Sequence, residues 1–322
     1  MHKEIEGRAL RAIEEKAFPG CVVGTVKANG ERDVWSFGTL IYESGEKVRE
    51  DTIYDLASIT KSIPTASLAL SFIEGGRLKL EDPVLKYIPE LHNDFGATIE
   101  DLLCYRVRGT RLSTLRYKTF EEIRTHVFEH GFDGPPGERH YTNLPAYILG
   151  VIVERIGNAS LAKQAHDRFF EPLHMSRTTF FPSTSDCAPT EIDERGVVQG
   201  LPHDESAYVF AKERRAVGHA GLFSTVPDLL NFLESLLKGE YSYVADGAQK
   251  GLGWQLRDQM EMGKRASPQA FGKTGFTGTS IVVDMGAGLG FVILSNRTYP
   301  TRPKDMSAIN EFRADIADII IS

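Results

Sequence analysis

Residues 58–76 read SITKSIPTASLALSFIEGG, and this stretch decides how the rest of the chain is understood. Lys61 is its only charged residue before Glu74, and it ends at the pair Gly75-Gly76. A helix that is apolar on all sides is a buried helix, so the sequence predicts a buried helix over residues 58–75. Pro64 falls in the early turns of this helix and predicts a kink there.

Strand patterns lie on both sides of this helix. Residues 21–27 and 33–40 are β-rich and are separated by Asn29-Gly30, a strong hairpin pattern. Further strand patterns near the other end of the chain cover residues 253–256, 270–274, 280–284 and 289–295. A last helix is predicted over residues 307–320, and a first, amphipathic one within residues 1–20.

The middle of the chain has a different pattern. Residues 80–202 are helical and loop-rich, with periodic stretches at 119–130, 144–156 and 161–170. We therefore predict one domain of the α/β class, α+β in type. An antiparallel sheet flanked by helices is built from residues 1–79 and 203–322, and a mainly helical subdomain of residues 80–202 is inserted.

The composition is that of a globular protein, with 322 residues, 41% apolar and 25% charged. The net charge of -7 and a pI near 5.8 argue against general nucleic-acid binding, which needs clustered Lys and Arg. Apolar runs such as residues 66–73 are too short to cross a bilayer. Residues 1–20 contain four glutamates and no signal-peptide pattern, so we expect a cytoplasmic protein.

Neither cysteines nor histidines have the spacing of a metal site. Cys21, Cys104 and Cys187 are too scattered for a disulfide framework or a zinc site, and we expect small buried residues. A cysteine nucleophile at Cys104 is the alternative. His126 and His130 are four residues apart on a predicted helix, but no carboxylate accompanies them, so we assign no metal and no cofactor.

Three short motifs contain the parts that a hydroxyl nucleophile needs: a base, donors for an oxyanion, and a proton source. They are Ser58-x-x-Lys61, Tyr141-Thr142-Asn143 and Lys273-Thr274-Gly275. Ser-x-x-Lys also occurs at residues 44–47, 160–163 and 235–238, but only Ser58 opens a wholly apolar helix. There its hydroxyl lies at the positive helix end, with Lys61 one turn further on the same face.

Each motif has a simpler interpretation when it is read alone. A capping serine with an outward lysine, a capping asparagine beside a packed tyrosine, and a strand end with its turn are all common. The three motifs together favour catalysis. Two lysine charges near Tyr141 would then favour its phenolate and make it a usable base.

With these motifs the chain resembles the serine β-lactamase-like family, which contains class C β-lactamases, DD-peptidases, D-aminopeptidases and related carboxylesterases. The resemblance extends over nearly the whole chain, including Phe18-Pro19-Gly20, Gly75-Gly76-Arg77-Leu78 and the stretch at 218–224, GHAGLFS. It implies a β-lactamase/transpeptidase-like fold. Tyr-x-Asn in place of Ser-Asp-Asn points to the class C and esterase branch.

The resemblance also implies roles, residue by residue. Ser58 is the acylated nucleophile, Lys61 its activator, and Tyr141 the general base that passes a proton to the leaving group. Asn143 and Lys273 hold and polarise the substrate. The oxyanion hole comes from the backbone N–H groups of Ser58 and Phe276, next to Thr274 and Gly275.

Two stretches depart from the family pattern. Residues 102–110 read LLCYRVRGT where members commonly have a Leu-Leu-Thr-His-Thr-Ser-Gly-Leu run, which predicts a differently built loop. Arg106, Arg108 and Arg111 are expected to be solvated, and attraction of an anionic substrate is the alternative. Lysine at position 273 is the β-lactamase and peptidase choice, whereas many esterase-like members have histidine. His203, Asp204 and His219 are interpreted as structural hydrogen-bonding residues.

We expect a serine hydrolase that acts through an acyl-enzyme on a small ester or amide. A β-lactamase or a D-amino-acid peptidase of the DD-carboxypeptidase kind is the alternative within the class, with a lactam or peptide as substrate. A catalytically weak penicillin-binding or sensing protein is the alternative from another class, and acyl transfer to an acceptor other than water stays open. No nucleic-acid partner is expected, and the sequence predicts no particular oligomeric state.

Overall fold

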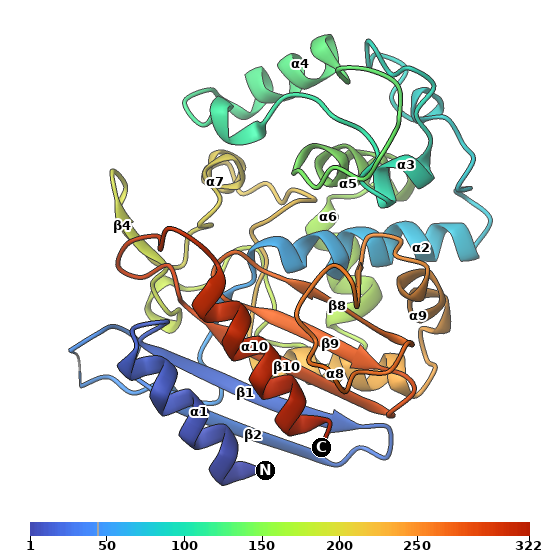
Figure 1. Ribbon diagram of the computed structural model, residues 1–322. Coiled ribbons are helices and arrows are strands. Elements are labelled where there is room, and N and C mark those ends of the chain that lie inside the picture. The colour runs from blue at the N-terminus through green and yellow to red at the C-terminus, as the bar shows by residue number, and fades with distance from the viewer. Residues whose placement is uncertain (44) are drawn as a thin grey trace.

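A six-stranded antiparallel sheet forms the base of the computed structural model, which describes residues 1–43 and 45–322 (Figure 1). The strand order is β2-β1-β10-β9-β8-β7. The strands come from the first and last parts of the chain: β1 (Gly20–Lys27), β2 (Arg32–Gly38), β7 (Gln255–Leu256), β8 (Ala270–Thr274), β9 (Ser280–Asp284) and β10 (Leu289–Ser295). The predicted sheet from both chain ends is confirmed.

The central strands β1 and β10 join the two ends of the chain, with Cys21 opposite Ser295. Helices α1 (His2–Glu14) and α10 (Ser307–Ile320) cover one face of the sheet, and α8 (Val226–Leu237) covers the other (Figure 1). Because both faces are covered, β10 is buried along its whole length.

A helical region lies above the sheet in the view of Figure 1. Its helices are α3 (Ile99–Leu103), α4 (Phe120–His130), α5 (Leu144–Gly157), α6 (Leu161–Ala165) and α7 (Glu205–Lys212). Helix α2 (Ser67–Glu74) contacts both α5 and α9 (Ser242–Gln249) and so lies between the two parts. Buried side chains from both parts form one hydrophobic cluster.

Two short strand pairs lie outside this sheet, and the sequence does not predict them. They are β3 (Tyr54–Asp55) with β6 (Phe223–Ser224), and β4 (Glu191–Asp193) with β5 (Gly196–Val198). Elements of two or three residues are too short to leave a periodic pattern.

The predicted helix over residues 58–75 is broken. Residues Ala57–Lys61 form a 3₁₀ turn, Ser62–Ala66 a wider turn, and only Ser67–Glu74 a regular α-helix. The break falls at Ile63, with φ -113° and ψ 111°. Proline disfavours the helical conformation in the residue before it, so Pro64 accounts for the break and the predicted kink is confirmed.

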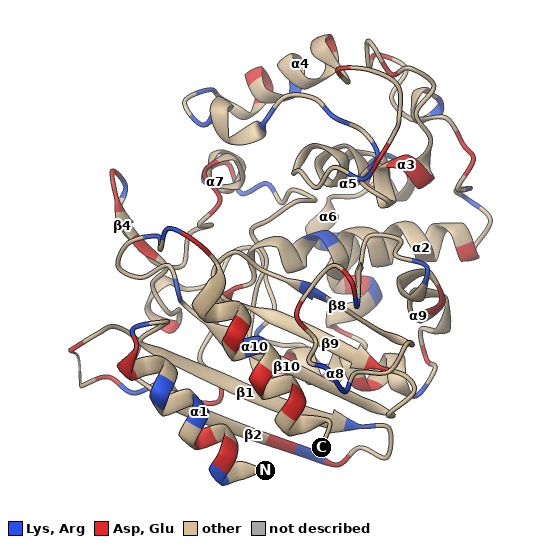
Figure 2. Ribbon diagram, viewed as in Figure 1, with Lys and Arg blue, Asp and Glu red and all other residues tan. Residues whose placement is uncertain are grey.

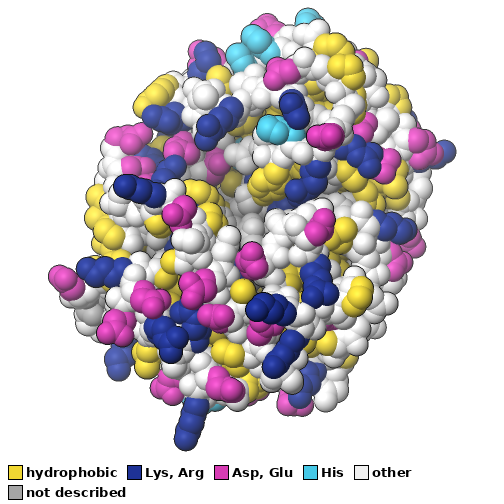
Figure 3. Space-filling view, viewed as in Figure 1, with side chains coloured by type: hydrophobic (Ala, Val, Ile, Leu, Met, Phe, Trp, Pro, Cys, Tyr) yellow, Lys and Arg dark blue, Asp and Glu magenta, His cyan; other side chains and the backbone are white. Residues whose placement is uncertain are grey.

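Charges of both signs are interspersed over the fold (Figure 2). On the face shown in Figure 3, Lys and Arg side chains alternate with Asp and Glu, and the surface is hollowed between the helical region and the sheet. Within residues 1–43 and 45–322, no helix is both long enough and apolar enough to span a membrane.

The contact between β1 and α8 supports a first prediction. A Cβ atom at Gly24 would collide with Cγ1 of Val226 and lie 3.0 Å from a methyl of Leu230. Gly24→Ala should therefore lower the unfolding free energy by about 1–3 kcal/mol. Val226→Ala should cost less stability in this variant than in the wild type, because it removes the collision. Denaturant titrations measure both.

Gly7→Ala is the matched control, because Gly7 lies in α1 with nothing within 4 Å of an added Cβ. It should raise stability by about 0.5–1 kcal/mol. A harmless Gly24→Ala would mean that α8 packs less closely on the sheet than described.

Candidate active site

Ser58 directly follows a residue in the left-handed backbone region. Ala57 has a φ of 47°, a conformation that costs an L-residue about 1–2 kcal/mol. The buried carboxylate of Asp55 accepts the N–H of Ala57 at 2.7 Å and holds this turn. The turn therefore fixes where the Ser58 hydroxyl points.

Lys61 is the partner of that hydroxyl. Its Nζ donates to Ser58 Oγ at 2.8 Å and to the carbonyl oxygen of His219 at 2.7 Å. Only 1% of Lys61 is exposed. Burial disfavours the ammonium and lowers the pKa of Lys61 to about 7, although the nearby charge of Asp204 acts in the opposite direction.

The turn after β8 brings Lys273 to the same place. Thr277 and Thr279 donate their hydroxyls to the carbonyl oxygens of Asp55 and Leu56, at 2.7 and 3.1 Å. Gly275 lies so close to this backbone that a Cβ would collide with the Leu56 carbonyl oxygen. A small residue is therefore required between Lys273 and the segment that carries Ser58.

Lys273 and Lys61 both lie against the ring of Tyr141. Their amines are 4.7 and 5.5 Å from its centroid, respectively. Lys273 is fully buried and its Nζ donates to the hydroxyl of Tyr105 at 3.4 Å. Burial, with the charges of Lys61 and Arg139, holds the pKa of Lys273 well below its usual range. The four side chains predicted to converge are thus brought together.

Tyr141 does not have the acidic phenol that the sequence suggests. Desolvation of its hydroxyl raises its pKa to about 12. The hydrogen bond with the Ser58 hydroxyl and the charge of Arg139 act in the opposite direction. The prediction that Tyr141 favours its phenolate form is therefore wrong. Burial also lowers the pKa of both lysines, so they favour the phenolate less than solvated ammonium groups would.

Asn143 precedes α5, but its side chain does not cap that helix. Its Nδ2 donates to Oδ2 of Asp204 at 2.9 Å. The other oxygen of Asp204 accepts from Ser206 Oγ at 2.6 Å and from the N–H of Ala207 at 2.9 Å, and it lies 3.4 Å from Nε2 of His219.

These contacts decide the ionisation of Asp204. Burial would raise its pKa, but hydrogen bonds from His219, Ser206 and Ala207 outweigh burial and lower it. Asp204 therefore stays a carboxylate beside Lys61 and His219. From the sequence, Asp204 is interpreted as a structural residue, because a position at the start of a helix does not reveal its proximity to Lys61.

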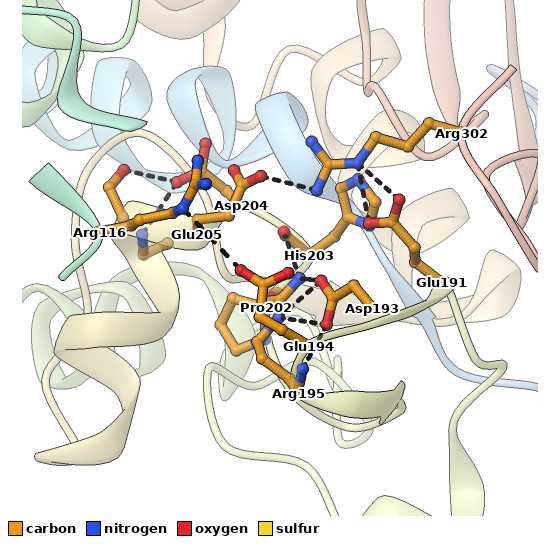
Figure 4. Close-up of polar contacts among 12 residues, drawn as sticks. Arg116, Glu191, Asp193, Glu194, Arg195, Pro202, His203, Asp204, Glu205 and Arg302 are labelled. Atoms are coloured by element: carbon orange, nitrogen blue, oxygen red, sulfur yellow. Dashed lines mark hydrogen bonds and ion pairs between the residues drawn. The ribbon is translucent and has the colours of Figure 1, made fainter. Parts of the chain in front are cut away.

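The segment of residues 202–204 is held by hydrogen bonds from Arg195 and flanked by ion pairs of Arg302 (Figure 4). Arg195 donates to two of its carbonyl oxygens, at 2.9 and 3.3 Å. Arg302 donates to Glu191 at 2.8 Å and lies 2.8 Å from Glu205, the residue that follows the segment. The position of the Asp204 carboxylate is therefore fixed from several elements.

Two backbone donors face the same region. Within the described part of the chain, the N–H groups of Ser58 and Phe276 have no hydrogen-bond acceptor. Phe276 itself is 40% exposed. The carbonyl oxygen of Gly275, which shares a peptide group with the Phe276 N–H, accepts from Arg313 at 3.0 Å, and this orients the peptide. Thr274 is turned toward Gln255, whose Oε1 accepts from both its N–H and its hydroxyl.

Tyr105 is a site residue that sequence reasoning missed. It lies in the loop that departs from the family pattern, is 2% exposed, and its ring centroid is 5.0 Å from that of Tyr141. In the same loop, Arg106 lies 3.6 Å from the carboxylates of Glu100 and Asp101. This arginine is therefore paired, and the loop contributes an aromatic side chain to the site.

Other sequence candidates lie elsewhere. Burial raises the pKa of Cys104, which disfavours a thiolate nucleophile there. His126 and His130 stack with centroids 3.8 Å apart. Ser160 caps α6 and Ser235 donates within α8, whereas Ser44 lies outside the described residues.

The fold and the site together define a protein of the class that contains β-lactamases and penicillin-binding proteins. The chain belongs to the Beta-lactamase family, whose model matches residues 7–315. A curated relative, a putative D-alanyl-D-alanine carboxypeptidase of Escherichia coli K12, is 28% identical over 81% of this chain and 73% of its own length.

Solved structures have the same fold. D-amino acid amidase from Ochrobactrum anthropi SV3 has a TM-score of 0.78 at 17% identity and covers 99% of this chain and 98% of its own. EstCE1, a hydrolase with promiscuous acyltransferase activity, has a TM-score of 0.77 at 20% identity, covering 100% and 98%. A β-lactamase/D-alanine carboxypeptidase from Pseudomonas syringae has a TM-score of 0.76 at 19% identity, covering 97% of both chains. The family indicates a hydrolase of the serine β-lactamase type, and these neighbours share its fold.

The burial of Lys61 predicts how stability varies with pH. Its pKa is about 7 in the folded chain and 10.5 when unperturbed, so between these values the unfolded chain binds the extra proton and stability rises with pH. Relative to Lys61→Met, wild-type protein should gain about 2 kcal/mol or more of unfolding free energy from pH 7 to 10. Denaturant titrations of both proteins at the two pH values measure this gain. Equal changes in the two proteins would mean that the amine has an ordinary pKa.

Proposed function

We propose that this protein hydrolyses a small ester or amide through an acyl-enzyme on Ser58. The observation that carries the proposal is the 2.8 Å hydrogen bond from a fully buried lysine amine to a serine hydroxyl. A buried lysine with a pKa near 7 is partly uncharged at neutral pH, and an uncharged amine can take the proton of the hydroxyl.

In the first step Ser58 Oγ forms a bond to the substrate carbonyl carbon, and its proton passes to Lys61 Nζ. Negative charge then develops on the carbonyl oxygen. The free N–H groups of Ser58 and Phe276 are suited to stabilise this oxyanion, and Lys273 adds positive charge when it is protonated.

In the second step the bond to the leaving group breaks. Tyr141 has a raised pKa and so keeps its proton at neutral pH. It donates this proton to the departing oxygen or nitrogen and recovers one from Lys61. Water then attacks the acyl-enzyme and releases the acid, with proton transfers in the reverse order. Tyr141 thus acts as an acid in the first half-reaction, and the base there is Lys61.

Ser58→Ala tests the nucleophile. Turnover of a nitrophenyl ester, a chromogenic cephalosporin and a D-alanyl peptide should fall by about 10⁴-fold or more for whichever of them is a substrate. Intact-mass spectrometry should show a fluorophosphonate adduct on the wild-type protein and none on the variant. Ser235→Ala, in another Ser-x-x-Lys match, is the control and should keep both. An adduct that survives in Ser58→Ala would place the nucleophile elsewhere.

The pH profile tests the base. The acylation rate should fall as the pH drops through about 7, because protonated Lys61 cannot accept a proton. Asp204→Asn removes the negative charge that favours the ammonium, so this limb should shift to lower pH by about one unit. Asparagine still caps α7. Stopped-flow acylation from pH 5 to 9 measures the shift.

Asp228→Asn is the control for this shift, since Asp228 is a buried carboxylate at the start of α8 that does not act on Lys61. It should leave the limb in place. A limb that moves to higher pH in Asp204→Asn, or does not move, would contradict the role of Lys61 as base.

A D-amino-acid peptide is the second candidate substrate, and Arg139 favours it. This arginine is exposed, has no ion pair among the described residues, and lies 5.7 Å from the ring centroid of Tyr141. A free cation beside the proton donor suits a leaving group that ends in a carboxylate. The carboxypeptidase names of the curated relatives point in the same direction.

A further inference from the structure

A cavity of about 720 Å³ lies among α4, α5, α6 and the end of α7. Ser58, Lys61, Tyr141 and Lys273 are not among the residues that line it. It is therefore distinct from the candidate active site. Such a volume is that of a small-molecule site.

Aromatic side chains form much of the cavity wall. Phe120, Tyr147, Phe181 and Phe210 all line it, and Tyr147 and Phe210 pack together with ring centroids 5.7 Å apart. Tyr147 is buried and belongs to α5, so this part of the wall is rigid. The cavity thus has an apolar surface on which a ring or a branched chain can lie.

Arginines line the same cavity. Arg215 lies 4.1 Å from the ring centroid of Phe120, and Arg214 lies 4.9 Å from that of Phe181. Neither of them, nor Arg124, has an ion pair within residues 1–43 and 45–322. Stacking on aromatic rings holds two of these guanidinium groups at the wall while leaving their N–H donors free.

The wall has fewer acidic residues than unpaired arginines. Glu154 accepts the N–H of Leu161 at 2.8 Å. Glu213 is the other carboxylate of the wall. The cavity is therefore cationic in a chain whose net charge is -7.

We propose that this cavity binds a small organic anion that carries an aromatic or branched apolar group. The free guanidinium groups of Arg214, Arg215 and Arg124 pair with its carboxylate or phosphate, since their planar forks fit both. The rings of Tyr147 and Phe210 take its apolar part.

The cavity also touches the segment that anchors Lys61. Gly218 lines it and lies so close to α5 that a Cβ would collide with the carbonyl oxygen of Ala146. The next residue is His219, whose carbonyl oxygen accepts from Lys61 and whose ring centroid lies 6.1 Å from that of Tyr147. A ligand in the cavity thus changes the environment of this anchor, and it should alter the acylation rate of Ser58.

Titration of ¹⁵N-labelled protein with phenylacetate, phenyl phosphate and neutral phenylacetamide tests the binding. Saturable shifts of the Gly150 and Gly218 amide signals are expected with at least one of the anions. The neutral amide should bind about tenfold more weakly. Stronger binding of phenylacetate or of phenyl phosphate tells a carboxylate ligand from a phosphate ligand. Because Gly218 precedes the residue that accepts from Lys61, the shift of Gly150 and its weakening in the arginine variants distinguish binding here from binding at Ser58.

Arg214→Gln, Arg215→Gln and Arg124→Gln should each weaken binding about tenfold, and these exposed positions tolerate glutamine. Arg11→Gln, an exposed arginine on α1, is the control and should bind as the wild type does. Absence of saturable shifts, equal binding of the neutral amide, or unchanged binding in all three variants would overturn the proposal. An acylation rate that is the same with and without bound anion would overturn the coupling to Ser58.

Discussion

The removal of the Lys61 amine from water is the constraint on which the rest of this structure depends. A buried ammonium is costly, so burial lowers the pKa of Lys61 and favours loss of its proton. Two acceptors, Ser58 Oγ and the His219 carbonyl oxygen, offset part of the remaining cost. The same burial that destabilises the charged form prepares the uncharged base. Stability and reactivity are therefore opposed at this residue.

The surrounding fold buries this amine and fixes its position. Asp55 holds the strained turn before Ser58, and the hydroxyls of Thr277 and Thr279 tie the end of β8 to the same backbone. Asp204 supplies the opposite charge, at a position fixed by Arg195 and by the start of α7. Groups from distant parts of the chain are thus aligned by hydrogen bonds to the backbone, which leaves the side chains of the site free to react.

Much of the fold could be predicted because its determinants are local. The Asn29-Gly30 hairpin, the four late strands and the last helix each leave a pattern within a few residues, and all appear where that pattern predicts them. The break at Ile63 is different, since the apolar run hides it and only Pro64 indicates it. Tyr105 and Asp204 could not be found in this way, because their importance depends on distances to Lys273 and Lys61 that no local pattern contains. The predicted shift in the pKa of Tyr141 has the wrong sign for another reason, because counting nearby lysines ignores the effect of burial on the phenol and on the lysines themselves.

The proposed mechanism requires that Lys61 is partly an uncharged amine at neutral pH, hydrogen-bonded to Ser58. Nitrogen NMR of lysine labelled at Nζ tests it most directly, with the Lys61 resonance identified by its loss in Lys61→Met. This resonance should titrate with a midpoint near pH 7. A midpoint above pH 10, as for a solvated lysine, would contradict it.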